Sequence, residues 1–224
     1  MSTHKDLTHT TSGQGAEFLS RVYSLKDANA AKDLYGEWAA SYDNDLESSS
    51  YVSPQLAVAA VVGHIDNSLG HLKVLDAGCG TGLVGLHLSR SPLATSPGLT
   101  IDGLDLTPAM LSVARQKGVY QDLDVADLTK QIERVDGSYH IVTCVGTLTK
   151  GHVGPKVINE FARVVSHGGL VVATVHEEVW ESGGYKSVVE ALAKRDLVEI
   201  VGTEEFGMVE GSERGGRMVV LRKR

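Results

Sequence analysis

A short apolar run leads directly into a glycine-rich turn early in the chain, and this feature limits the possible folds most. Residues Val74 to Gly82 read Val-Leu-Asp-Ala-Gly-Cys-Gly-Thr-Gly, which is typical of a buried strand that ends in a tight turn and opens a helix. Glycines permit positive φ angles and let the backbone approach a ligand with no Cβ in the way. In open α/β sheets, ligands bind outside the carboxyl ends of the strands. The segment therefore predicts an α/β fold with a nucleotide-like ligand at this edge.

Short apolar strands and helical segments alternate on both sides of this loop. Before the last part of the chain, strands are predicted over Leu72 to Asp76, Leu99 to Asp105, part of Val119 to Asp127, Tyr139 to Val145 and Leu170 to Val175. Helices are predicted between them, over Gly82 to Ser89, Pro108 to Lys117 and Pro155 to Val165. This rhythm favours a doubly wound, mostly parallel sheet with helices on both faces.

The last part of the chain departs from the alternation. A helix over Tyr185 to Arg195 is followed by two strands, Leu197 to Thr203 and Arg217 to Leu221, with no helix between them. Strands that follow each other without a crossover helix pair antiparallel. We therefore expect a seven-stranded, mostly parallel sheet of the Rossmann-like type whose last strand is antiparallel.

Two helices are predicted ahead of the sheet. Apolar and aromatic positions recur at helical spacing from Ala28 to Leu46, with the helix ending near Asp43, and Pro54 suits the first turn of a second helix that runs to about Leu69. Residues 1–15 offer little apolar surface and are expected to be a disordered tail. The expectation is one domain over residues 16–224, with a helical cap at about 28–69.

Charge and composition exclude several classes of partner. The formal net charge is -7, with 28 acidic and 21 basic residues, and no basic patch is apparent, so nucleic acid is not expected as a partner. The longest apolar run, Leu56 to Val62, is too short to span a bilayer. Cys79 and Cys144 form no CxxC pair, which argues against disulfides and metal sites. We expect a cytoplasmic protein with a small-molecule substrate, and the sequence indicates no particular oligomeric state.

The glycine spacing alone fits two kinds of cofactor, because Gly80 to Gly85 also satisfies the GxGxxG pattern of dinucleotide enzymes. Asp76 would repel a pyrophosphate, whereas S-adenosylmethionine carries an ammonium and a sulfonium and no phosphate. Asp105, at the end of the next strand, suits ribose hydroxyls in either case. None of the seven tyrosines has a lysine four residues on, and few residues remain for a dehydrogenase substrate domain. These features favour S-adenosylmethionine over NAD(P).

Several segments resemble the class I S-adenosylmethionine-dependent methyltransferases. Val74 to Gly82 is similar to their motif I, Leu104 to Leu111 to their motif II, and Val164 to Gly169 to their R-V-L-x-P-G-G turn. Two further segments, Tyr35 to Asp43 and Val145 to Pro155, resemble the methyltransferase-like 27 (Williams-Beuren region 27-like) group.

The resemblance implies which residues hold the cofactor. The motif I segment would line the methionine portion, the motif II acid Asp105 would hold the ribose, and Asp127 would contact the adenine. Residues after the fourth strand would flank the cofactor, and Tyr42 would help to cover it. The implied cofactor-binding set is Tyr42, Asp76, Ala77, Gly78, Cys79, Gly80, Gly82, Asp105, Leu106, Met110, Asp127, Leu128, Val145 and Gly146.

Methyl transfer is an in-line displacement, so the enzyme mainly aligns the donor with the acceptor and excludes water. For a hydroxyl acceptor a base would help. His152 is the candidate, the alternative being that it only orders the loop before Pro155. Tyr35, Trp38 and Tyr42 are either an aromatic lid or the buried stripe of a helix. A protein of this fold that binds the cofactor without methyl transfer is an alternative, and a NAD(P)-dependent oxidoreductase a weaker one.

Overall fold

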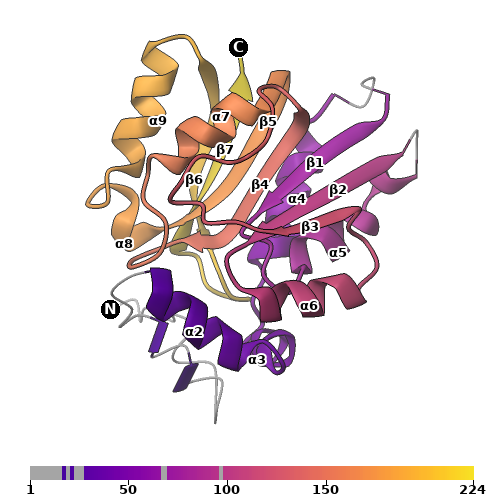
Figure 1. The fold of residues 1–224 in the computed structure, drawn as a ribbon. Coiled ribbons are helices and arrows are strands. Elements are labelled where there is room, and N and C mark those ends of the chain that lie inside the picture. The colour runs from indigo at the N-terminus through magenta and orange to yellow at the C-terminus, as the bar shows by residue number, and fades with distance from the viewer. Residues whose placement is uncertain (1–16, 19–20, 23–27, 67–69, 96–97) are drawn as a thin grey trace.

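A computed structural model describes residues 17–18, 21–22, 28–66, 70–95 and 98–224. Seven strands form one sheet in the order β3-β2-β1-β4-β5-β7-β6, with helices on both faces (Figure 1). β7 pairs antiparallel with both β5 and β6, and the other pairs are parallel. The predicted fold is confirmed, including the antiparallel last strand. The tail expected at residues 1–15 lies outside the described residues, and the division into a tail and one domain stays a prediction.

The predicted helices and strands occur in the predicted order with shifted ends, and the structure adds a 3-10 helix and α8, which were not predicted. In chain order they are α2 Ala28–Trp38, α3 Tyr42–Ser48, α4 Ser53–His64, β1 Leu72–Ala77, α5 Leu83–Ser89, the 3-10 helix Pro92–Ala94, β2 Leu99–Asp105, α6 Pro108–Gln116, β3 Asp122–Val125, β4 Tyr139–Leu148, α7 Val157–Val164, β5 Val165–His176, α8 Glu177–Trp180, α9 Tyr185–Lys194, β6 Val198–Gly207 and β7 Gly215–Lys223. No helix among the described residues is both long and apolar enough to cross a membrane.

The alternation of side chains along each strand builds two separate cores. On one face, Val74 and Ile141 pack with residues of α4 and α5. On the other, Leu75 and Val142 pack with residues of α7 and α9. Because helices cover both faces of the central strands, apolar side chains occur on both faces, with a few polar residues such as Lys73, Asp76 and Thr143 among them.

The cap differs from the prediction in two places. The expected helix over Ala28 to Asp43 is wrong as one element, because the chain turns at residues 39–41 and divides it into α2 and α3. Asp45 contributes to this turn, since one of its carboxylate oxygens accepts hydrogen bonds from the Trp38 indole (2.7 Å) and the Ser41 hydroxyl (2.9 Å). The second helix, α4, ends at His64 rather than about Leu69, and Leu69 lies outside the described residues.

In addition to the packing of α4 against the sheet, hydrogen bonds near Tyr51 and at Asp43 are two of the points that attach the cap to the rest of the molecule. Near the connection between β6 and β7, Tyr51 forms a β-bridge with Val209, and the N–H of Val52 donates to the carbonyl of Met208 (2.9 Å). At the other point, Asp43 of α3 accepts hydrogen bonds from the Thr81 hydroxyl and the Lys117 ammonium, both at 2.5 Å. The second point joins the cap to the glycine-rich loop itself.

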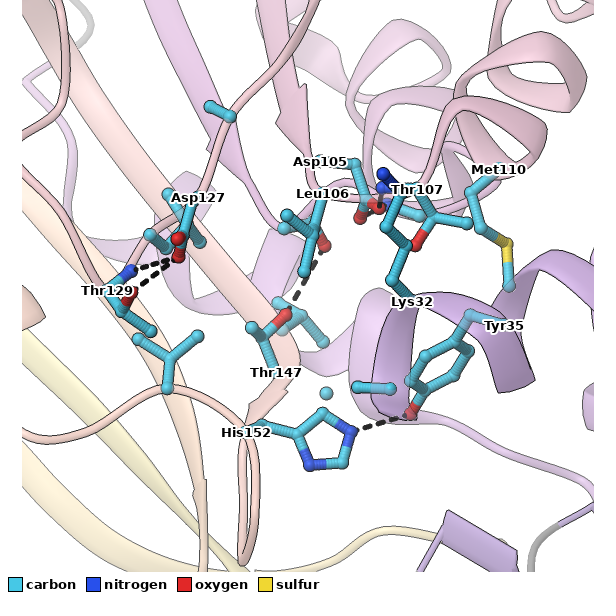
Figure 2. A pocket seen from close by; sticks show the side chains of 18 of the residues that line it. Lys32, Tyr35, Asp105, Leu106, Thr107, Met110, Asp127, Thr129, Thr147 and His152 are labelled. Carbon is cyan, nitrogen blue, oxygen red and sulfur yellow. Dashed lines mark hydrogen bonds between the residues drawn. The ribbon is translucent and has the colours of Figure 1, made fainter. Parts of the chain in front are cut away.

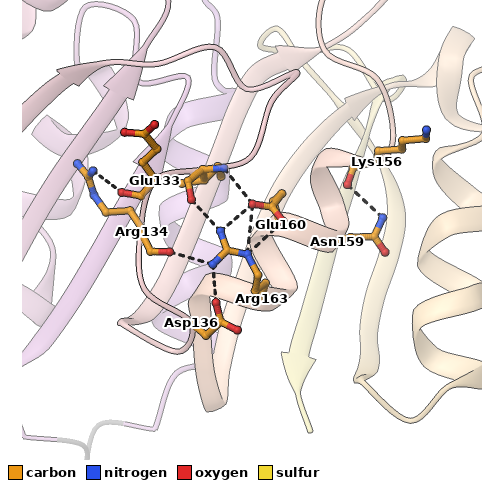
Figure 3. A network of polar contacts seen from close by, with 8 residues as sticks. Glu133, Arg134, Asp136, Lys156, Asn159, Glu160 and Arg163 are labelled. Atoms are coloured by element: carbon orange, nitrogen blue, oxygen red, sulfur yellow. Dashed lines mark hydrogen bonds and ion pairs between the residues drawn. The ribbon is translucent and has the colours of Figure 1, made fainter.

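A network centred on Arg163 fixes the long connection between β3 and β4 to α7 (Figure 3). The Arg163 guanidinium donates to the carbonyls of Ile132 (2.7 Å) and Arg134 (2.8 Å) and to the carboxylates of Asp136 (2.6 Å) and Glu160 (2.7 Å). The planar guanidinium suits this role because it has five N–H donors in a fixed fork. The connection begins at the sheet edge that carries the candidate site, so the network supports one wall of that site.

Candidate active site

A cavity of about 710 Å³ lies at the carboxyl ends of β1, β2 and β4, beneath α2. This is the point where the chain order reverses across the sheet, since β2 and β4 flank β1 on opposite sides. The described residues that line the cavity are Ala31, Lys32, Tyr35, Tyr42, Gly78, Gly80, Asp105, Leu106, Thr107, Met110, Ala126, Asp127, Leu128, Thr129, Val145, Gly146, Thr147, His152 and Val153.

Asp105 is held firmly at the end of β2. One of its carboxylate oxygens accepts the N–H of Gly80 at 2.9 Å, and the other accepts the N–H of Thr107 at 2.8 Å (Figure 2). Burial raises the pKa of this carboxyl, and the two backbone N–H groups oppose that rise. A carboxylate has about four acceptor positions. These two bonds leave acceptor capacity for hydroxyl groups in the cavity.

Asp127 follows β3 on the same side of the cavity. One carboxylate oxygen accepts hydrogen bonds from the N–H of Thr129 (3.0 Å) and from its hydroxyl (2.6 Å) (Figure 2). The other oxygen lies 3.2 Å from the Lys130 ammonium. Partial burial raises the pKa of Asp127, but the bonds to Thr129 and Lys130 together lower it by more. Asp127 is therefore ionised and presents a fixed carboxylate, with the apolar side chain of Leu128 beside it.

The glycine-rich loop lines the cavity with backbone alone at two positions. Gly78 has a φ of 74°, and a Cβ there would overlap the side chain of Thr147. No atom lies within 4 Å of the position that a Cβ on Gly80 would take. The loop lets a ligand lie against its backbone, as the glycine pattern predicted.

Four of the residues predicted from motif I do not line this cavity: Asp76, Ala77, Cys79 and Gly82. Asp76 is fully buried behind the loop, where it accepts hydrogen bonds from the hydroxyls of Tyr120 (2.7 Å) and Thr143 (2.9 Å). Burial raises its pKa to about 6. The Asp76 carboxylate therefore lies behind the glycine-rich loop and does not line the cavity.

Tyr120 is the residue behind this loop that the sequence did not indicate. Its ring occupies space left by two glycines of the motif, since a Cβ at Gly82 would lie 2.8 Å from the ring and one at Gly85 would overlap it. The N–H of Gly85 also donates to the Tyr120 hydroxyl at 3.2 Å. The last glycine of the GxGxxG pattern thus makes room for a tyrosine.

Cys79 and Cys144 have no part in nucleophilic chemistry. Both side chains are buried, and burial raises the pKa of each thiol well above its usual range, with the nearby charges of Asp76 and Asp105 adding to the rise. A protonated thiol is a poor nucleophile.

His152 and Tyr35 meet at the side of the cavity opposite Asp105 (Figure 2). The Tyr35 hydroxyl lies 3.2 Å from Nε2 of His152, and Nδ1 of His152 lies 3.0 Å from the carbonyl oxygen of Lys150. The ring of Tyr35 also packs against Tyr42 and His152 at centroid distances of 6.1 and 5.7 Å. The structure therefore brings the candidate base together with two of the three cap aromatic residues.

The structure brings eleven of the predicted residues together at one cavity: Tyr42, Gly78, Gly80, Asp105, Leu106, Met110, Asp127, Leu128, Val145, Gly146 and His152. Sequence reasoning missed Lys32, which adds a positive charge from α2, and Thr107 and Thr129, whose backbone N–H groups orient the two acids. The Thr that follows each acid by two residues was a usable signal, because such Asp-x-Thr turns bond their own backbone.

A doubly wound sheet with an antiparallel last strand and a cavity at the glycine-rich switch point defines a nucleoside-binding α/β enzyme. A family model described as "Methyltransferase domain" matches residues 74–169. The chain is 31% identical to Methyltransferase-like protein 27 of Homo sapiens over 85% of this chain and 72% of that protein. The chain belongs to the class I S-adenosylmethionine-dependent methyltransferases, and its cofactor is S-adenosylmethionine.

More distant relatives share part of the chain or the fold alone. The chain is 30% identical to the Ubiquinone biosynthesis O-methyltransferase of Erwinia tasmaniensis over 62% of this chain, and it spans about half (51%) of that protein. A solved TehB-like S-adenosylmethionine-dependent methyltransferase from Corynebacterium glutamicum has a TM-score of 0.60 and 23% identity, covering 85% of this chain and 98% of that one. This last similarity shows the fold.

The residues of the cavity fit S-adenosylmethionine. The carboxylates of Asp105 and Asp127 suit ribose hydroxyls and an amino group of the ligand. The apolar side chains of Leu106, Met110 and Leu128 suit the adenine ring. The side-chain-free surface at Gly78 and Gly80 suits the methionine portion, and the Lys32 ammonium suits a carboxylate.

Proposed function

We propose that this methyltransferase transfers the methyl group to a hydroxyl oxygen of a small molecule, and that Tyr35 and His152 carry the acceptor's proton away. The observation that carries this proposal is the hydrogen bond between Tyr35 Oη and His152 Nε2 at the cavity wall. The similarity to a protein named an O-methyltransferase of ubiquinone biosynthesis supports an oxygen acceptor.

The contacts of His152 determine its tautomer. A carbonyl oxygen can only accept, so Nδ1 beside the Lys150 carbonyl carries the proton, and Nε2 has a free lone pair that accepts from the Tyr35 hydroxyl. Burial lowers the pKa of His152 below its usual value of 6.5. The ring is therefore neutral at pH 7 and able to take a proton.

The proton and electron balance is complete with these groups. Bound S-adenosylmethionine supplies a methyl carbon on a sulfonium, and the C–S electron pair returns to sulfur as the acceptor oxygen bonds to that carbon. The proton of the acceptor hydroxyl passes to Tyr35 Oη, and the proton of Tyr35 passes to His152 Nε2. The positive charge lost at the sulfonium then resides on the imidazolium until His152 releases the proton to solvent.

The residues around the cavity support the remaining parts of the proposal. The cap helices and the loop after β4 line the site, which suits a small-molecule acceptor rather than a nucleic acid or a membrane surface. Both cysteines are free, as expected for a cytoplasmic protein.

The test starts from methyl-labelled S-adenosylmethionine and a small-molecule extract, from which the labelled product identifies the acceptor. With that acceptor, kcat/KM should rise with pH and level off, with a midpoint below 6.5, because His152 must be neutral to accept the proton. His152→Gln should remove this dependence and lower kcat by about 10²–10⁴-fold. His167→Gln, which changes an exposed histidine, is the matched control.

Two results would contradict the proposal. An extract that yields no labelled product would favour a protein that binds the cofactor without methyl transfer. An unchanged pH dependence in His152→Gln would remove the proton-accepting role of His152.

A further inference from the structure

A second cavity of about 590 Å³ adjoins the cofactor cavity on the side of the cap. Tyr35, Tyr42 and Gly146 line both cavities. The remaining described residues around the second cavity are Val22, Trp38, Leu46, Tyr51, Leu148, Thr149, Thr174, His176 and Met208.

A β-bulge in β4 lies between the two cavities. At Gly146, which lines both cavities, only backbone atoms separate them. The pairing of β4 with β5 shifts register between Cys144 and Leu148, and Gly146 within this bulge has a φ of 74°. The Gly146 N–H donates to the Thr174 hydroxyl at 2.9 Å, which fixes the bulge to β5. A Cβ on Gly146 would lie 3.0 Å from the Tyr51 hydroxyl, so glycine avoids both a tight contact and an unfavourable φ at this position.

The walls of the second cavity are aromatic and carry no permanent charge. Tyr35, Trp38 and Tyr42 pack in stacked and edge-to-face arrangements, with a centroid distance of 4.6 Å between Trp38 and Tyr42. Among its described lining residues there is no Asp, Glu, Lys or Arg, in contrast to the cofactor cavity with Asp105, Asp127 and Lys32. Burial raises the pKa of Tyr42 and of Tyr51, so both phenols stay neutral.

We infer that the second cavity binds the methyl acceptor, and that the acceptor is an uncharged, planar aromatic compound with a hydroxyl group. Flat aromatic walls favour a planar ring, because aromatic pairs gain stacking and edge-to-face contacts beyond the burial of apolar area. A charged group would be desolvated there without a partner of opposite charge. The Tyr35 hydroxyl, at the junction, is the group that meets the acceptor hydroxyl, so the inference rests on the proposed function.

The test measures binding of 2-naphthol by calorimetry to the protein saturated with S-adenosylhomocysteine, beside 2-naphthalenesulfonate as a charged ligand of the same ring. We expect 2-naphthol to bind and the sulfonate to bind at least about ten-fold more weakly. Met208→Trp and Thr149→Trp each place a large ring in the second cavity. Each should lower the binding affinity for 2-naphthol by about ten-fold or more. Glu210→Trp adds the same ring at an exposed position beside Met208 and should change nothing.

The affinity for S-adenosylhomocysteine separates the possible failures. It should be unchanged in the three variants, which also shows that they are folded. Normal S-adenosylhomocysteine binding without 2-naphthol binding, equal binding of the sulfonate, or full 2-naphthol affinity in both filled variants would overturn this inference alone. Absence of S-adenosylhomocysteine binding by the unmodified protein would instead contradict the proposed function.

Discussion

At the scale of the residue, the acids of the site have different roles although they look alike in the sequence. Asp105 and Asp127 face the cofactor cavity, whereas Asp76 lies behind the glycine-rich loop with Tyr120 and Thr143. The sequence places Asp76 before the glycines, but its partners are 44 and 67 residues away and no local pattern indicates them. Asp76 therefore supports the choice of a cationic ligand less strongly than Asp105 supports a bound ribose.

The buried Asp76 carboxyl predicts a specific pH dependence of stability. Its pKa is about 6 in the folded protein, against an ordinary value of 3.8, so the folded protein binds more protons than the unfolded chain between these values. The contribution of Asp76 to the free energy of unfolding should fall by about 3 kcal/mol in total as pH rises from about 3 to 7, with about 2 kcal/mol of this between pH 4 and 6. Urea unfolding of the unmodified protein and Asp76→Asn at several pH values measures this difference.

The control for that measurement is Asp122→Asn, which removes an exposed carboxylate from β3. If the difference in free energy of unfolding between Asp76→Asn and the unmodified protein stays constant from pH 4 to 7, the pKa of Asp76 is not raised in the folded protein.

At the scale of the element, the strands and helices were predicted well and the irregularities were not. Periodicity located all seven strands because both faces of the sheet are apolar or alternate regularly. The bulge at Gly146 depends on a contact with the distant residue Thr174, whereas the turn at residues 39–41, where Asp45 accepts hydrogen bonds, interrupts an otherwise regular helical pattern. Eleven of the predicted site residues still meet at one cavity, because they follow strand ends that the fold brings to one edge.

The Arg163 network predicts that α7 and the connection before β4 depend on one guanidinium. Arg163→Lys keeps the charge but cannot reach both carbonyls and both carboxylates, so the free energy of unfolding should fall by about 1–3 kcal/mol. Arg195→Lys, at an exposed position, is the matched control. Chemical denaturation measures the change. Equal stability of the two variants would mean that the network contributes little beyond a surface ion pair.

At the scale of the whole molecule, the cap completes two cavities that the sheet alone would leave open. α2 and α3 supply Tyr35 and Tyr42 to both cavities, and Asp43 joins the cap to Thr81 of the glycine-rich loop. Among the described lining residues, charged side chains occur only at the cofactor cavity, whereas Trp38 and Tyr51 line only the second cavity. Under the proposal for the second cavity, the cofactor and the methyl acceptor bind on either side of Gly146.

The central claim is that the cavity at the carboxyl edge of the sheet holds the cofactor through Asp105. Calorimetric titration with S-adenosylhomocysteine and with NADH, of the unmodified protein and of Asp105→Ala, tests it most directly. We predict binding of S-adenosylhomocysteine and none of NADH, with the affinity of Asp105→Ala lower by about 1–3 kcal/mol. Binding of NADH alone, or an Asp105→Ala variant with undiminished affinity for S-adenosylhomocysteine, would contradict the account.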